Sequence, residues 1–139
     1  MNVQILHKKE EIFNFLKSDQ ELQTYCIGDL DDFFWSKTIW YSLEDEGVVR
    51  SIALLYTGSD FPTLLLFYKG EKEYPFLLLK QIQNLLPNKF YAHLSEGLVD
   101  LFGRQNIIQY YGLSYKMALR KELKTIDDEN IQRLSISNL

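Results

Sequence analysis

Three carboxylates within four positions of the sequence are candidates for metal binding or acid–base catalysis. Asp29, Asp31 and Asp32 directly follow Gly28, and side chains of this type can bind a divalent cation or act as general bases. An oxygen-only metal site usually gathers more carboxylates, with a characteristic loop spacing. Aspartates at the start of a helix also accept hydrogen bonds from free backbone N–H groups and face the positive end of the helix dipole. We therefore expect helix capping and first-turn charge to be their main role, with no metal bound.

Two other groups of reactive side chains lack the spacing that catalysis or zinc binding needs. His93 and Ser95 share a face of an expected strand, and Asp100 lies nearby in the sequence. A hydrolytic serine usually sits on a strained turn flanked by glycines, and no such turn surrounds Ser95. His7, His93 and Cys26 are too scattered to form the close pairs typical of zinc sites. Structural roles are expected for all of these side chains.

The densest aromatic cluster of the chain follows the aspartates and comprises Phe33, Phe34, Trp35, Trp40 and Tyr41. Packing in the core is the simplest interpretation, since large aromatic side chains dominate protein interiors. The alternative is a contact surface, because tryptophan and tyrosine often anchor interfaces. We retain Asp29, Asp32, Trp35, Trp40 and Tyr41 as the candidates for such a surface.

Length and composition exclude several classes of protein. The 139 residues suit one domain of common size, and 46% hydrophobic with 24% charged residues is typical of a globular chain. The net charge of −4 argues against a protein that binds nucleic acid by neutralising phosphates. The single cysteine forms no internal disulfide, and no apolar run approaches the roughly 20 residues of a membrane-spanning helix. We expect a cytoplasmic protein with neither a nucleic-acid nor a membrane partner.

The first third of the chain is expected to contain one strand and two helices. Val3–Leu6 fits a short strand, and Lys8–Ser18 carries apolar residues at the i, i+3, i+4 spacing of an amphipathic helix. Asp19 is the expected cap of a second helix, and Gly28 its expected end in a left-handed conformation. Asp29 is then placed to cap the following turn.

After this region the hydrophobic period changes from helical to strand-like. Thr38–Leu43, Val48–Tyr56 and Thr63–Tyr68 read as three strands with short links, which predicts an antiparallel meander. Trp40 and Tyr41 should then point to opposite faces of the sheet. The remaining expected elements are a helix, a strand, a short helix and at least one more strand, at 74–86, 89–94, 98–102 and within 107–119. The pattern predicts an α+β fold with a central, mostly antiparallel mixed sheet flanked by helices.

The end of the chain reads like the beginning of another module. Residues 121–130 are the most polar stretch and resemble a linker. Ile131–Leu134 echoes Val3–Leu6, and Ser137–Leu139 looks like a helix cap followed by the first apolar residue of a helix. We expect a domain over 1–120, a linker over 121–130 and the start of a second domain at 131–139.

The expected order of elements resembles the GNAT superfamily of acyl-CoA-dependent N-acetyltransferases. A more particular resemblance lies in Tyr25–Trp35, which contains Gly28-Asp29-Leu30 before the aromatic cluster, and in Thr38–Tyr41. These segments are similar to the N-terminal half of two-domain GNAT proteins, and the likeness continues through residues 53–58 and 92–95. The resemblance implies a GNAT-like fold here and an acetyl-CoA-binding catalytic domain that begins near Ile131.

One departure from the family pattern bears directly on the cofactor. GNAT domains bind the pyrophosphate of acetyl-CoA with a Gln/Arg-x-x-Gly-x-Gly/Ala loop before a helix, where glycines let backbone N–H groups approach the phosphates. The equivalent stretch here, Tyr68–Pro75, has Gly70 as its only glycine and also carries Glu71 and Glu73. We therefore expect no cofactor in this chain, and acetyl-CoA in the second domain.

The resemblance thus implies a non-catalytic N-terminal domain that packs against a catalytic GNAT domain. Asp29, Asp32, Trp35, Trp40 and Tyr41 would then be the residues that contact that domain or shape its acceptor site. One alternative is a self-contained module that binds a ligand or forms a homodimer without enzyme activity. Another is a complete small acetyltransferase with an unusual phosphate loop, so whether this chain is itself an enzyme stays open.

Overall fold

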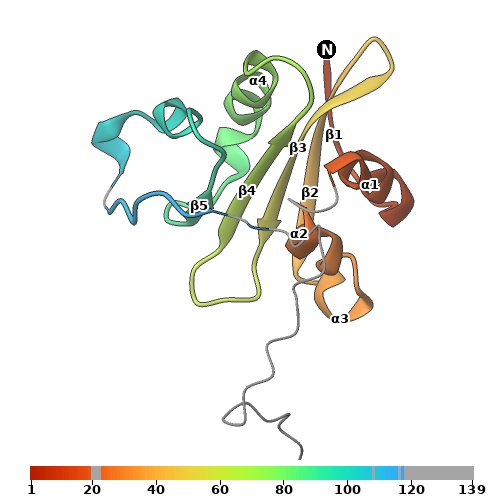
Figure 1. Cartoon of the computed structure of the whole chain (residues 1–139), viewed down its shortest axis with the longest axis horizontal. Coiled ribbons are helices and arrows are strands. Elements are labelled where there is room, and N and C mark those ends of the chain that lie inside the picture. Colours follow the sequence, from red (N-terminus) through yellow and green to blue (C-terminus); the bar gives the residue numbers. More distant parts are fainter. Residues whose placement is uncertain (20–22, 108, 116, 118–139) are drawn as a thin grey trace, which may run out of the picture.

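A five-stranded sheet forms the centre of the molecule (Figure 1). The computed structural model describes residues 1–19, 23–107, 109–115 and 117. The strands lie in chain order across the sheet: β1 Asn2–Ile5, β2 Thr38–Asp45, β3 Val48–Tyr56, β4 Thr63–Tyr68 and β5 Tyr91–His93. Neighbouring strands are antiparallel except β4 and β5, which run parallel. The expected α+β fold with a mostly antiparallel mixed sheet is confirmed.

Helices flank both faces of this sheet (Figure 1). The α-helices of the described residues are α1 Lys9–Leu16, α2 Thr24–Gly28, α3 Asp32–Trp35 and α4 Glu73–Ile82. Short 3-10 turns cover Lys17–Asp19, Gln83–Leu85, Val99–Phe102 and Arg104–Asn106. No helix among the described residues is both long and apolar enough to cross a membrane.

Strand alternation divides the core into two clusters. Trp40 and Tyr41 are both buried and point to opposite faces, as predicted. We call the first group the α1-side cluster; its buried members are Leu6, Ile12, Phe15, Leu16, Cys26, Trp40, Ile52, Leu54 and Phe67. The second is the α4-side cluster, with Tyr41, Leu43, Ala53, Leu55, Leu64, Leu66, Leu78, Leu79, Ile82 and Leu98. Through each cluster, helices pack on one face of the sheet.

The predicted meander of β2, β3 and β4 is confirmed, and its first hairpin has a tight turn. Glu46 and Gly47 connect β2 to β3 with φ angles of 51° and 76°. Two consecutive residues with positive φ are typical of the hairpin turn whose twist matches that of the flanking strands. The pairing shifts register between Leu43 and Glu44, which leaves Arg50 as an extra residue in β3.

The helix boundaries between β1 and β2 differ from the expectation. Asp19 ends a 3-10 turn rather than capping a helix, and α2 begins at Thr24. Gly28 is the last residue of α2 and does not take a left-handed conformation. Asp29 continues the helical turn at φ −68°, so Asp31 and not Asp29 caps the next helix. Local capping signals identified the right residue types here but the wrong aspartate.

The second half of the chain contains less regular structure than its sequence predicts. Helix α4 begins at Glu73, one residue before the expected start, and stops at Ile82, where a 3-10 turn follows. The strand expected over 89–94 is reduced to β5. The strand expected within 107–119 is wrong for the described part, where 107, 109–115 and 117 have no regular structure. Tyr110, Tyr111, Leu113 and Tyr115 are exposed, so strand-forming side chains find no neighbouring strand to pack on. The linker and second-domain predictions for 121–139 lie outside the described residues.

Candidate functional site

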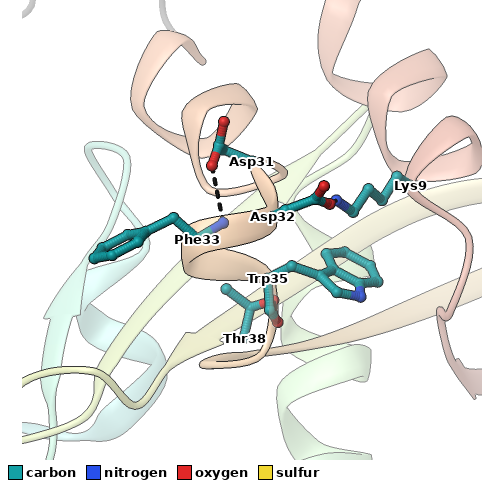
Figure 2. A network of polar contacts seen from close by, with 6 residues as sticks. All are labelled: Lys9, Asp31, Asp32, Phe33, Trp35 and Thr38. Atoms are coloured by element: carbon teal, nitrogen blue, oxygen red, sulfur yellow. Dashed lines mark hydrogen bonds and ion pairs between the residues drawn. The ribbon is translucent and has the colours of Figure 1, made fainter.

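The aspartate-rich turn before β2 is organised around the cap of α3 (Figure 2). Asp31 is extended, at φ −58° and ψ 144°, and its Oδ1 accepts a 2.8 Å hydrogen bond from the backbone N–H of Phe33. This bond satisfies one of the N–H groups that the first turn of a helix leaves free. The predicted capping role is therefore confirmed for Asp31.

Asp32 joins α3 to α1 through Lys9 (Figure 2). The Lys9 ammonium forms an ion pair with Asp32 Oδ1, and its Nζ also lies 5.2 Å from the centroid of the Trp35 ring. Attraction between an ammonium and the electron-rich face of an indole reinforces such a contact. The hydrogen bond and the positive charge from Lys9 lower the pKa of the Asp32 carboxyl. The Asp32 side chain is fully open to solvent, so it remains available to a second molecule.

Asp29 differs from its two neighbours in its surroundings. It is half-buried at the end of α2, and it is not a partner in the ion pairs of the described residues, which are Lys8–Glu11 and Lys9–Asp32. Loss of water around it raises the pKa of the Asp29 carboxyl above its usual value. A nearby cation or hydrogen-bond donor would stabilise the ionised form of such a carboxylate.

The two aromatic candidates on β2 are core residues. Trp40 is 1% exposed, and its Nε1–H donates a 2.9 Å hydrogen bond to Thr38 Oγ1, whose hydroxyl in turn donates to the Trp35 carbonyl at 2.8 Å. Tyr41 is 4% exposed in the α4-side cluster, and burial raises the pKa of its phenol. The structure thus brings Asp32, Trp35 and Trp40 together around α3. It places Tyr41 on the other face of the sheet.

The sequence alone does not identify two residues that the structure adds to this region. Lys9 gave no local signal, because its partner Asp32 is distant in the chain and only the packing of α1 beside α3 brings them together. Phe33 belongs to the aromatic cluster but is 70% exposed, with its ring against Phe34 at 4.9 Å and under Lys37 Nζ at 5.2 Å. The exposed part of the aromatic cluster is therefore Phe33, rather than Trp40 or Tyr41.

The connection from β4 to α4 is the second region of interest, since a phosphate-binding loop would lie here. Lys69 does not face this loop: its Nζ lies 4.5 Å from the centroid of the Phe15 ring, which belongs to the α1-side cluster. Glu71, Lys72 and Glu73 are all exposed, and the Lys72 ammonium lies close to Gly97. The charges that the connection leaves open to solvent at the start of α4 thus include two carboxylates.

An aromatic side chain lies beside the single glycine of this connection. Gly70 has a φ of +85°, and a Cβ at this position would meet the Tyr74 ring at 3.8 Å. The Arg50 guanidinium lies over the same ring, 5.8 Å from its centroid. The Tyr74 ring is therefore the neighbour that a side chain at the exposed position 70 would contact, at ordinary van der Waals distance.

The parallel pair β4–β5 is short. Thr63, Leu64 and Leu65 pair with Tyr91, Ala92 and His93, and β5 then ends. The second half of β4, Leu66–Tyr68, continues without β5 toward the start of α4. The sheet is thus incomplete, within the described part of the chain, on the side that faces the β4–α4 connection.

Comparison with protein-family models and with curated proteins finds no match. Among solved structures, a probable acetyltransferase is similar over 88% of this chain and 100% of its own, with a TM-score of 0.50 and 10% sequence identity. A ribosomal-protein-alanine N-acetyltransferase from Brucella melitensis biovar Abortus 2308 covers 86% of this chain and 100% of its own, with a TM-score of 0.47 and 14% identity. An aminoglycoside N-acetyltransferase in complex with CoA covers 90% and 100%, with a TM-score of 0.38 and 11% identity. At 10% identity the likeness to the probable acetyltransferase shows the fold alone, and this chain has a GNAT-like fold.

Proposed function

We propose that this chain is a GNAT-like domain without a CoA site of its own, which packs against a catalytic acetyltransferase domain and helps to shape its acceptor site. The observation that carries the proposal is the β4–α4 connection. It combines a single glycine, the Tyr74 ring beside that glycine, and exposed glutamates at positions 71 and 73.

Elementary electrostatics supports this proposal. A pyrophosphate gains most of its binding energy from backbone N–H groups and positive charge at a helix N-terminus. Each carboxylate about 4 Å from a phosphate costs roughly 1 kcal/mol even in bulk water, and more where water is excluded. Lys69 is turned to Phe15, so of the two lysines of the connection only the exposed Lys72 remains to offset the two carboxylates, Glu71 and Glu73.

The acceptor side of the proposal rests on the turn around α3. Asp32 is open to solvent beside Lys9 and Trp35, and Asp29 is a half-desolvated carboxylate outside the ion pairs of the described residues. An amine acceptor is cationic before it loses its proton, so carboxylates next to an aromatic face suit its recognition. Trp40 positions Trp35 indirectly. Its indole N–H donates to the Thr38 hydroxyl, which in turn donates to the Trp35 backbone carbonyl.

A second candidate function is a complete small acetyltransferase with an unusual phosphate loop. The observation in its favour is that the similarity to the probable acetyltransferase extends over the whole of that chain. The two candidates differ in one measurable property, which is the affinity of this chain for acetyl-CoA.

Isothermal titration of the full chain with acetyl-CoA separates them. We expect no saturable binding up to about 1 mM, which corresponds to a binding free energy weaker than about −4 kcal/mol. The double variant Glu71→Gln/Glu73→Gln, which removes the two carboxylate charges of the connection and keeps its lysines, should bind no more weakly than the unchanged chain. A micromolar Kd for the unchanged chain would contradict the proposal and favour the complete enzyme.

The two-domain part of the proposal has a separate test in the gene. If the reading frame continues past Leu139, it should encode a Gln/Arg-x-x-Gly-x-Gly/Ala motif about 100 residues further on, as expected for a domain of common size. A continuing frame without that motif would contradict the two-domain part, whatever the titration shows.

A further inference from the structure

One edge of the sheet is formed by β1 and is open to pairing within the described part of the chain. β1 pairs with β2 on one side, and three of its four residues are exposed. Natural edge strands usually carry a lysine, a proline or a bulge that blocks another strand. Asn2-Val3-Gln4-Ile5 is short but has no charge and no proline, and its register with β2 is regular.

A single hydrogen bond shows which backbone groups of β1 point away from β2. The Leu6 N–H donates to the Trp40 carbonyl of β2 at 2.8 Å. Because alternate residues of an antiparallel strand face the same neighbour, Asn2 and Gln4 also direct their backbone groups to β2. The N–H and C=O groups of Val3 and Ile5 therefore point outward from the edge.

The opposite edge of the sheet is less suited to pairing. β5 has three residues, and the ring of Tyr111, from a later segment of the chain, lies 6.2 Å from the ring of Tyr91. Among the described residues no ring contact of this kind involves β1, and Ile5 remains 49% exposed on the α4 side of the sheet. A second strand beside β1 would cover this apolar side chain.

We propose that β1 is a homodimerisation edge, where a second copy of this chain pairs β1 with β1 in antiparallel fashion about a two-fold axis at Gln4. In this register Val3 of each copy lies opposite Ile5 of the other, and their outward N–H and C=O groups are exchanged in pairs. The side chains of Val3 and Ile5 lie on one face of the strand, so each pairing makes an apolar cross-strand contact.

The partner is a second copy rather than an unrelated strand because this register is self-complementary. Each Val3–Ile5 pair joins two β-branched side chains, the type that packs best across strands. The pairing would join the two five-stranded sheets edge to edge. The inference goes beyond the proposed function and does not depend on acetyl-CoA binding.

Sedimentation equilibrium of the full chain over a concentration series up to about 1 mM tests the dimer. The weight-average mass should rise from 16.4 kDa toward twice that value. Val3→Pro removes an outward N–H without breaking a bond to β2, and two such bonds are lost per dimer, so its dimer Kd should rise about tenfold or more. Ile5→Lys should act in the same direction by placing a charge on the edge. Val48→Lys, at an exposed strand position outside β1, is the matched control and should leave the mass unchanged.

Amide hydrogen exchange locates the contact independently of the variants. The Val3 and Ile5 amides should become protected as concentration rises, whereas the Leu6 amide, bonded within the chain, should be protected throughout. A mass that stays at 16.4 kDa at every concentration overturns the proposal. So does a dimer that both β1 variants leave intact, or one in which the Val3 and Ile5 amides gain no protection.

Discussion

At the residue scale, three aspartates of one short segment have three different environments. Asp31 accepts the Phe33 N–H and caps α3, Asp32 pairs with Lys9, and Asp29 is half-buried outside the ion pairs of the described residues. Their carboxyl groups are chemically identical, so the differences arise from where the backbone directs each side chain. Burial raises the pKa of Asp29, whereas Lys9 lowers the pKa of Asp32.

These opposite shifts predict opposite effects of removing each charge. The folded pKa of Asp32 lies below 3.8, so its pairing stabilises the fold above that pH and is lost as the pH falls through the folded pKa. Asp32→Asn should therefore destabilise slightly at pH 7. The folded pKa of Asp29 lies above 3.8. Its ionised form therefore destabilises the folded state, and this effect is lost when the carboxyl is protonated in acid. Asp29→Asn should be neutral to stabilising at pH 7.

Urea unfolding of the two variants and the unchanged chain between pH 3 and pH 7 measures both effects. The Asp29→Asn gain should fade between the raised pKa and 3.8, and the Asp32→Asn loss only below 3.8. Added salt should reduce the Asp32 effect, since that side chain is open to solvent. Equal effects of the same sign for both variants would refute the assignment of these environments.

At the element scale, the hairpin between β2 and β3 carries a local strain. Glu46 has a φ of 51°, a left-handed conformation that is costly for a residue with a long side chain, whereas Gly47 at 76° bears little cost. Asparagine tolerates this conformation better, and Asn-Gly is the preferred pair for such a turn. Glu46→Asn should therefore stabilise the protein by about 0.5–1 kcal/mol.

Glu46→Gln is the matched control for this turn, because it removes the same charge without relieving the backbone. The difference in free energy of unfolding between the two variants then isolates the conformational effect. An asparagine variant no more stable than the glutamine variant would show that the turn is not strained.

At the scale of the whole molecule, the sheet separates two clusters that must nevertheless fold together. Trp35 and Trp40 belong to the α1-side cluster, whereas Leu78 is fully buried in the α4-side cluster. Each strand contributes to both faces, so neither cluster has a complete wall without the other. Leu78→Ala should cost about 2–5 kcal/mol and should lower the unfolding midpoint seen by tryptophan fluorescence, although no tryptophan lies in its cluster.

Far-UV circular dichroism of the same variant gives the second probe. Both signals should shift by the same amount, as expected for one cooperative transition. A tryptophan transition that stays in place while the dichroism transition shifts would mean that the two clusters unfold separately.

The parts of the molecule that could be predicted from residues alone are those whose signals are local. The alternation in Thr38–Tyr68 predicted the three-stranded meander, and the helical spacing after Gly70 predicted α4. Trp40 and Tyr41 were placed on opposite faces because strand geometry leaves no other choice. The departures from the phosphate-loop pattern were likewise readable, since they depend on residue identity at a few consecutive positions.

Features that join distant segments became visible only in the folded molecule. The contact of Lys9 with Asp32 and Trp35 exists because the packing of Ile12 and Trp40 in one cluster sets α1 beside α3. The parallel pairing of β5 depends on where α4 returns the chain, and the apolar residues within 109–115 and at 117 join no strand of the described part. A strand is stabilised by its neighbours across the sheet, and its own sequence does not specify which strands these will be.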